Sequence, residues 1–511
     1  MATARAREPR SLEPAEPLPA AAWIPLIGVA AVVTLAHLAT NGRYGFHRDE
    51  LQFLSDARHL DWGFVAYPPL TPFVEHVSMS LFGLSMVGLR LASVVAQAIA
   101  LVAVGLMARE FGGGRLAQFT ATLAVALSPV PLFNGTEFQY TSFDFLWWVL
   151  IAYFVARFLR TENPRWWLGI GGIIGLGLLT KYAIVFYIAG VLAGLALTPA
   201  RRVFLSRWFW AGVALALVLF LPNLVWLARH DFISYHFLQH IHVRDVGEGR
   251  TEHFWRDQVW ICISPAAAPL ALWGLVGLLR SSRFRAMAFL YLIPLGIFFA
   301  AKGRGYYMTG AYPMLLAMGA AAAGSWMGAR PAILRRGLPA VFYAGLAFCG
   351  AYIAAIVLPL ASDGPLRAFA LEHNGDLREE FGWQELVSTV AGIRDTLPAE
   401  QQANLGLVVG NYGEAGAIEI LGPALRLPAP ISMTNSAWLR GYPATPPTTL
   451  ILVGFSREWA ERNFTGCRLA GHNGNALGIH NEESDDHPDI FVCGPPRLSW
   501  AEFWKTHQFF G

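Results

Sequence analysis

Apolar residues along this chain come in long uninterrupted runs rather than in alternating faces. The runs fall near residues 22–40, 86–108, 116–133, 143–159, 167–180, 183–198, 208–227, 258–279, 286–301, 306–327 and 338–360. A helix needs roughly 20 apolar residues to cross a bilayer. The pattern therefore predicts a polytopic α-helical membrane protein with about eleven transmembrane helices. The fifth and sixth runs are short enough to be broken or re-entrant.

The polar segments between the runs alternate in charge. With residues 1–20 as a disordered cytoplasmic tail, every predicted inner loop is basic and nearly free of acids, as the positive-inside rule requires. The arginines of that side are Arg5, Arg7, Arg10, Arg109, Arg115, Arg157, Arg160, Arg165, Arg201, Arg202, Arg207, Arg280, Arg283, Arg285, Arg330, Arg335 and Arg336. An odd number of spans then places everything after residue 360 outside the cell membrane.

Residues 361–511 differ in character from the membrane half at 21–360. Short apolar strands are predicted at 405–410, 448–455 and 489–494, and they alternate with helical segments such as "EAGAIEILG" and "SREWAERNF". This pattern predicts a small extracytoplasmic α/β domain. Cys467 and Cys493 lie near predicted strand edges, where an oxidising compartment would allow a disulfide, while Cys262 and Cys349 are expected to be packing residues.

Composition narrows the class of protein further. The chain is 55% hydrophobic and 14% charged with a formal net charge of +3, which gives no reason to expect a nucleic-acid partner. Arginine outnumbers lysine heavily, which is typical of a GC-rich bacterial genome. The run "GIGGIIGLG" at 169–177 lies inside an apolar span without a preceding strand, so Gly171 and Gly175 are expected to serve close helix packing rather than nucleotide binding.

Acidic residues collect on the predicted outer side, which includes a large first external loop at 41–85. In that loop "HRDELQFLSDARHL" begins directly after the first span, and Asp49 and Glu50 open an amphipathic helix. Its Leu51, Phe53 and Leu54 are expected to lie in the lipid interface while the acids face a cavity. The alternative is a helix cap, since acids in a first turn favour the helix dipole.

Further polar groups flank the same side of the membrane. Asp144 stands at the entry to a span, with Glu137, Gln139 and Tyr140 just before it, and acids at such places are costly unless they serve a function. Candidate cavity residues are His47, Arg48, Tyr67, Pro68, Glu137, Tyr140 and Arg244.

Two of the three lysines are the next candidates. Lys181 interrupts "GLGLLTKYAIVF", and Lys302 precedes Arg304 in "AAKGRGYYMTGAYP", which also contains Tyr306 and Tyr307. These cations either snorkel to the interface or bind a phosphate there, to which lysine offers a compact charge and three donors.

Acids that activate a hydroxyl, cations that hold a phosphate and aromatic residues at membrane depth together indicate sugar transfer from a phosphate-bearing lipid. One carboxylate would act as general base on the acceptor. The leaving group is already an anionic phosphate ester, so fixed cations can stabilise it without a dedicated acid.

Several of these motifs resemble the bacterial family 39 glycosyltransferases. The motifs are the Asp-Glu pair, "YPPLTP", "TSFD", "GLLTKY" and "KGRGYYMTGAYP". That family belongs to the membrane-embedded C-type superfamily, with the protein O-mannosyltransferases and the lipid A aminoarabinose transferase. The resemblance covers roughly residues 22–360 and implies the C-type fold and a polyprenyl-phosphate-linked sugar donor.

The resemblance also implies roles for particular residues. Asp49 is expected to be the catalytic base with Glu50 beside it, Asp144 matches the family acid, and Lys181, Lys302 and Arg304 match basic positions near the carrier phosphate. His240 falls where the aminoarabinose transferase has a histidine that can bind metal, but Gln239 replaces the neighbouring glutamate. A divalent metal cofactor therefore stays open.

The resulting hypothesis is an inverting glycosyltransferase of the bacterial inner membrane that acts on its outer face. The acceptor is a lipid, a glycan or a protein, and membrane lipids surround the site. Two alternatives stay open. A transporter or flippase for an amphipathic lipid would need polar residues at mid-membrane and two related halves, and an inactive structural subunit would keep the fold without the chemistry.

Overall fold

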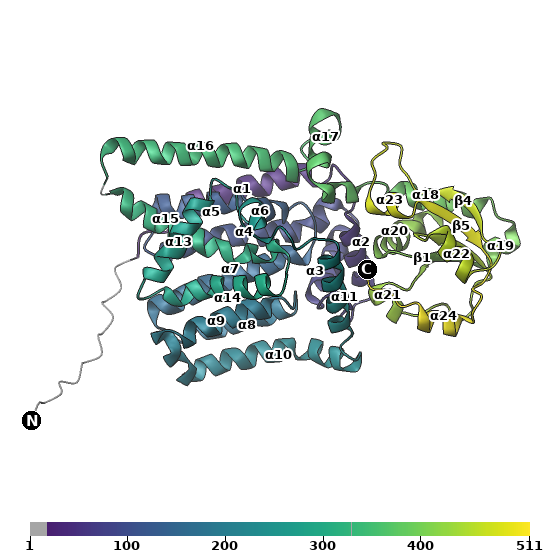
Figure 1. Ribbon diagram of the computed structural model, residues 1–511, viewed down its shortest axis with the longest axis horizontal. Coiled ribbons are helices and arrows are strands. Elements are labelled where there is room, and N and C mark those ends of the chain that lie inside the picture. Colours follow the sequence, from purple (N-terminus) through teal and green to yellow (C-terminus); the bar gives the residue numbers. More distant parts are fainter. Residues whose placement is uncertain (1–17, 329) are drawn as a thin grey trace, which may run out of the picture.

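The computed structural model describes residues 18–328 and 330–511, so most of the predicted tail at 1–20 lies outside the described residues. Figure 1 shows a bundle of helices that run roughly parallel to one another, with a sheet-containing part at one end. The bundle contains α1 (Trp23–Thr40), α4 (Met86–Glu110), α5 (Arg115–Ala126), α6 (Pro129–Phe133), α7 (Tyr140–Thr161), α8 (Trp166–Leu178), α9 (Ile184–Ala196), η1 (Pro199–Leu205), α10 (Arg207–Arg229), α13 (Ala268–Arg280), α14 (Arg285–Ala300), α15 (Tyr312–Gly328) and α16 (Ala332–Val357).

Each predicted apolar run contains a helix, but not every helix is long enough to cross a membrane. Among the described residues, five helices meet that requirement by length and hydropathy, namely α1, α4, α7, α10 and α16. A sixth span results if α9 and η1, which meet at 106°, are counted together. The structure thus supports a multi-pass membrane protein, and the number of eleven spans stays a prediction.

Three run boundaries differ from the prediction. The run at 116–133 is divided into α5 and α6 because Pro129 lacks an N–H and keeps Ser128 extended. The run at 258–279 becomes helical only at Ala268, and the run at 306–327 starts with a 3-10 segment, η2 (Gly305–Ala311).

Glycines bring α8 and α10 into close contact, as expected for "GIGGIIGLG". A methyl group at Gly171 would overlap the carbonyl oxygen of Gly212, and one at Gly175 would contact Leu219. The interpretation of these glycines as helix-packing residues is confirmed.

Four shorter helices connect the ends of the bundle helices on the side of the sheet. They are α2 (Arg48–Arg58), α3 (Leu70–Phe82), α11 (Ile233–Gly247) and α12 (Phe254–Trp260), and Figure 1 shows α2, α3 and α11 between the bundle and the sheet.

The C-terminal part is built around a five-stranded mixed sheet of order β2-β1-β3-β5-β4. Its strands are β1 (Leu405–Val409), β2 (Pro430–Ser432), β3 (Thr449–Val453), β4 (Arg468–His472) and β5 (Asp489–Cys493). β1 is parallel to β2 and β3, whereas β5 is antiparallel to β3 and β4. The three predicted strands are confirmed as β1, β3 and β5.

Helices cover both faces of this sheet. Leu407 and Val409 pack with α18 (Trp383–Asp395) and α20 (Tyr412–Leu421), while Val408 packs on the opposite face. The second face is covered by α22 (Arg457–Asn463) and α24 (Trp500–Thr506). The remaining elements are α17 (Gly364–His373), η3 (Gly375–Glu380), α19 (Ala399–Ala403), η4 (Gly422–Leu425), α21 (Asn435–Leu439) and α23 (Glu482–Asp486).

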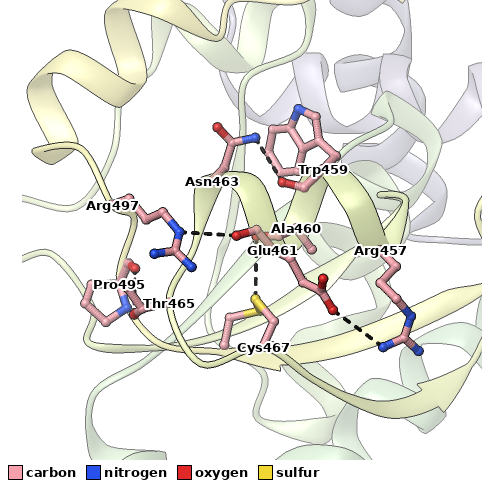
Figure 2. Close-up of a disulfide and its surroundings, with 10 residues drawn as sticks. Arg457, Trp459, Ala460, Glu461, Asn463, Thr465, Cys467, Pro495 and Arg497 are labelled. Atoms are coloured by element: carbon pink, nitrogen blue, oxygen red, sulfur yellow. Dashed lines mark hydrogen bonds and ion pairs between the residues drawn. A yellow bond between two sulfur atoms is a disulfide. The ribbon is translucent and has the colours of Figure 1, made fainter.

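Cys467 and Cys493 form the expected disulfide, which joins the residue before β4 to the end of β5. Figure 2 shows Cys467 beside α22, with its sulfur 3.6 Å from the carbonyl oxygen of Ala460. The carbonyl oxygen of Glu461, also on α22, accepts a hydrogen bond from Nε of Arg497. The disulfide therefore ties the start of the edge strand β4 to the end of β5.

The position of α2 corrects one expectation. Leu51, Phe53 and Leu54 are all buried, so they do not face lipid. Leu51 packs into the core on the α18 and α20 side of the sheet, and Leu54 contacts Ile420 of α20. Because α20 has Gly416 where it crosses α2, the two backbones approach closely at the Leu51 carbonyl. The apolar face of α2 is thus covered by protein.

Candidate active site

The start of α2 is set by a reciprocal cap. His47 Nδ1 accepts a hydrogen bond from the Asp49 backbone N–H at 3.1 Å, and Glu50 Oε2 accepts one from the His47 backbone N–H at 2.8 Å. Such a capping box satisfies N–H groups that a helix terminus leaves unpaired. Glu50 therefore acts as a cap, the alternative that the sequence left open.

Glu50 is turned inward, away from Asp49. Its two oxygens accept from Nε and Nη2 of Arg90, each at 2.7 Å, and Oε1 also accepts from the Phe138 backbone N–H. Arg90 is fully buried in α4 and is shared with Glu380 of η3, whose Oε2 lies 3.3 Å away. Sequence reasoning missed Arg90, although a single arginine inside an apolar run is a detectable signal.

Asp49 is half-buried, and each of its oxygens receives one hydrogen bond. Gln139 Nε2 donates to Oδ2 at 2.9 Å, and the hydroxyl of Tyr412 donates to Oδ1 at 2.9 Å. An ionised carboxylate offers about four acceptor positions. Asp49 is therefore held in place by two donors and still has lone pairs that can accept a proton.

Lys181 and Asp144 line a small cavity of about 30 Å³. Its lining includes Asn134, Trp148 and Tyr306. The Lys181 ammonium lies 4.8 Å from the ring centre of Tyr140, 4.5 Å from that of Tyr307 and 5.9 Å from that of Tyr306. Cations are attracted to the faces of aromatic rings, so the tyrosines hold the ammonium in position.

Lys181 has no hydrogen bond or ion pair within residues 18–328 and 330–511, although Asp144 and Arg304 are near enough for their charges to act on it. Asp144 itself accepts from the indole N–H of Trp148 at 3.1 Å. A half-buried cation that forms no ion pair and lines a cavity is suited to bind an anion.

Arg304 is near this group but is already paired. It forms a bidentate ion pair with the buried Asp245 of α11, with 2.6 Å between Nε and Oδ2. Arg244 lies beside the same acid, 3.8 Å from Oδ1. Lys302 is exposed, with a positive φ of 50° at the turn after α14, and the structure does not bring it to the cavity.

Other candidates of the first loop serve contacts to the C-terminal part. Arg48 pairs with Glu482 at 2.6 Å and Glu483 at 3.5 Å, rather than lining the cavity. The Tyr67 hydroxyl donates to Asp56, which forms an ion pair with Arg440, and Pro68 is buried beside it.

Glu137 is buried with its Oε2 3.4 Å from His47 Nδ1. Burial and the neighbouring acids Asp376, Glu50 and Asp49 raise the pKa of Glu137 well above its usual range. The neutral form is thereby favoured, which spares Asp49 a second negative charge at close range.

Within the described residues, the histidines of α11 are not grouped with other side chains that could bind a metal ion. His240 is exposed on α11, and its ring faces the rings of Phe509 and Phe510 at 6.4 and 6.0 Å. Across the described ranges there is no group of three or more His, Cys, Asp or Glu placed to hold a metal ion. The residues around His240 therefore do not fit a protein-built metal site.

Part of the chain is similar in sequence to known glycosyltransferases. Residues 66–226 match the sequence model of the dolichyl-phosphate-mannose-protein mannosyltransferase family. The lipid A galacturonosyltransferase RgtD of Rhizobium johnstonii is 30% identical over 190 residues, which cover 36% of this chain and 39% of the relative. The match thus spans about two fifths of that curated relative.

Solved structures extend the likeness to nearly the whole chain. ArnT from Cupriavidus metallidurans bound to undecaprenyl phosphate has a TM-score of 0.52 at 14% identity, covering 94% of this chain and 99% of that chain. The arabinofuranosyltransferase AftD from Mycobacteria also gives 0.52 at 14% identity, with 94% and 42% covered.

The fold is that of the membrane-embedded C-type glycosyltransferases. The family match over residues 66–226 and the curated relative point to the same group of proteins, which confirms the resemblance drawn from the motifs.

Proposed function

We propose that this protein transfers a sugar from a polyprenyl-phosphate donor to an acceptor hydroxyl on the outer face of the bacterial inner membrane, with inversion. The observation that carries this proposal is Lys181, a cation held over three tyrosine rings and unpaired within the described residues, beside the cavity that Asp144 also lines. The donor class is supported by ArnT, which was crystallised with undecaprenyl phosphate.

Asp49 is the proposed general base. Tyr140 is near both proposed groups, because its ring centre lies 4.8 Å from the Lys181 ammonium and its hydroxyl is close enough to Asp49 for that charge to act on it. The acceptor hydroxyl gives its proton to Asp49 while its oxygen attacks the anomeric carbon. The bond from that carbon to the phosphate oxygen breaks, and its electron pair leaves with the polyprenyl phosphate. A single displacement inverts the anomeric centre.

The cations stabilise the leaving group. Lys181 is the proposed contact of the phosphate, with Tyr306 and Tyr307 beside it and Arg304 near enough for its charge to act there. Fixed positive charge in a site sheltered from water lowers the barrier more than the same charge in bulk water does. The match to a lipid A galacturonosyltransferase favours a glycolipid acceptor, with a glycan or a protein as the other classes.

The proposed orientation follows from charge and from the arrangement of the parts. Arginines dominate the loops predicted to be cytoplasmic, and Figure 1 places the C-terminal part beside α2, which belongs to the first loop that is predicted to be external. Residues 361–511 would then be extracytoplasmic, where the Cys467–Cys493 disulfide is stable.

The test compares lipid-linked sugars and envelope glycans by mass spectrometry in cells that produce wild type, Asp49→Asn or Lys181→Gln at equal abundance. We expect both variants to accumulate one polyprenyl-phosphate sugar and to lose one glycan. Asp231→Asn is the matched control, because Asp231 is exposed in an outer turn at a φ of 50°, which asparagine also tolerates.

Unchanged pools in Asp49→Asn would contradict the general-base role. Unchanged pools in both variants would favour the transporter or the inactive-subunit alternative.

A further inference from the structure

The first residue of α20 contacts the carboxylate of Asp49. Asn411 caps this helix, since its Oδ1 accepts from the Gly413 backbone N–H at 2.6 Å, and Glu414 Oε2 accepts from the Asn411 N–H at 3.3 Å. The cap makes Tyr412 the first residue of the helix, from which its hydroxyl reaches Asp49 Oδ1 at 2.9 Å.

Polar contacts near both ends of α20 fix this helix against α2. Near the N-terminal end of α20, Arg48 stacks over the Tyr412 ring at 5.4 Å and pairs with Glu482 and Glu483 of α23. Near the C-terminal end of α20, a cluster of side chains joins α20 to α2. It consists of Ser55, Asp56, Glu419 and Arg440. Ser55 donates to Glu419 at 2.5 Å, and Arg440 donates to Ser55 at 2.8 Å and pairs with Asp56.

Packing adds to these contacts. Gly416 allows the α20 backbone to lie directly on the Leu51 carbonyl, four residues after Tyr412 on the same helix. The position of Tyr412 is therefore defined by two ion-paired clusters, one near each end of α20, and by a close backbone contact at Gly416 between them.

The chemistry of Tyr412 fits a donor rather than a competing base. Burial and the charge of Asp49 raise the pKa of Tyr412 well above its usual range, so the hydroxyl keeps its proton and donates it to the carboxylate. Gln139 donates to the second oxygen, and together the two donors fix the rotation of the Asp49 side chain.

We propose that Tyr412 is a positioning residue for Asp49, so that the C-terminal domain completes the site of the proposed transfer reaction. This inference rests on the proposed function. Without the Tyr412 donor, the carboxylate can rotate away from the acceptor hydroxyl, and misplacement of a reacting group by about 1 Å can cost about 100-fold in rate.

The test uses full-length Tyr412→Phe, with Tyr442→Phe as the matched control. Tyr442 lies in the same part of the chain but stacks on Trp500 and Trp504, with ring centres 5.5 Å apart in each case. Transfer is followed in cells as the ratio of product glycan to accumulated lipid-linked sugar. We expect Tyr412→Phe to lower that ratio by about 10-fold to 100-fold, and Tyr442→Phe to leave it near wild type.

Two readouts separate positioning from a merely structural role. Binding of undecaprenyl phosphate to the purified variant, measured by intrinsic fluorescence, should stay within about twofold of wild type, because Lys181 and its tyrosines are untouched. Protection of the C-terminal part against limited proteolysis should also be unchanged, because the clusters of Arg48 and Arg440 persist.

A double-mutant cycle on thermal unfolding tests the contact without reference to activity. The Tm changes of Asp49→Ala and Tyr412→Phe should not add in the double variant, because each removes the hydrogen bond between the Tyr412 hydroxyl and the Asp49 carboxylate. Additive Tm changes would overturn the proposal, as would an unchanged transfer ratio in Tyr412→Phe. An increased ratio would also overturn it, since the tyrosine would then restrain the base.

Failure of the proposed function has a different signature. In that case Asp49→Asn leaves the sugar pools unchanged, while the Tm cycle still reports the contact.

Discussion

Glu380 provides the sharpest test of how the first loop is attached to the rest of the protein. Its carboxylate is fully buried beside Arg90, and its backbone carbonyl accepts from the Gly45 N–H at 3.1 Å. Arg90 is also the bidentate partner of Glu50, so one guanidinium serves two acids. Burial, and after it the charge of Glu50, raises the pKa of Glu380 to about 8, against the opposing effect of Arg90.

The sign of the effect follows from proton linkage. Glu380 binds its proton more tightly in the folded protein than in the unfolded chain, where the pKa is near 4.5. Its contribution to stability is therefore fully present below pH 4.5 and is lost as the pH rises toward 8. For these two values the loss between pH 5 and pH 9 is about 4 kcal/mol.

Glu380→Gln removes the titrating group and keeps its shape. We expect the Tm of the variant in detergent to match wild type near pH 5 and to exceed it by about 5 °C near pH 9, as a difference of about 4 kcal/mol implies for a large domain. The measurement is thermal unfolding by intrinsic fluorescence from pH 5 to pH 9. Glu372→Gln, at an exposed acid of α17, is the control and should follow wild type throughout. Parallel curves for wild type and Glu380→Gln would refute the reasoning.

Two further predictions concern the C-terminal part. Gly416→Ala should loosen α20 from α2, because the added methyl group overlaps the Leu51 carbonyl, and overpacking of this kind costs about 1–3 kcal/mol. Limited proteolysis would detect the released domain, whereas Gly392→Ala on α18, with open space around it, should stay protected. Cys493→Ser should lower the free energy of unfolding by about 3.5 kcal/mol, the chain-entropy value for a loop with a sequence separation of 26. A reducing agent should lower the Tm of wild type and not that of the variant. Equal Tm values for the two proteins without reductant would contradict this prediction.

The sequence predicted the helices of the membrane half well because burial in lipid or protein leaves a local apolar signal. It predicted less well which helices span the membrane. α8 and α13 have 13 residues each, and the apolar runs that contain them do not show where a helix ends and a turn begins. The sequence also could not show what covers the side chain of Leu51. An apolar helix face looks the same whether lipid or α20 covers it, and the covering residue Ile420 lies far along the chain.

Prediction of the candidate site was uneven for similar reasons. Asp49, Asp144 and Lys181 were predicted together because each stands at the same predicted end of an apolar run, and the structure brings Asp144 and Lys181 to one cavity. Their catalytic and binding roles stay predictions. Tyr412 gave no local signal, because its contact with Asp49 arises only when the sheet docks on the bundle.

The burial of α2 between two unlike partners has a consequence for protein engineering and for divergence. One face of the helix contributes Phe53 to the bundle, while the other gives Leu51 to the sheet core and Leu54 to a contact with Ile420. A chimera that takes its C-terminal domain from a relative inherits an α20 shaped for a different α2. Such a graft should be made with residues 48–58 from the same donor, since the junction between the two halves lies within the first loop rather than at residue 360.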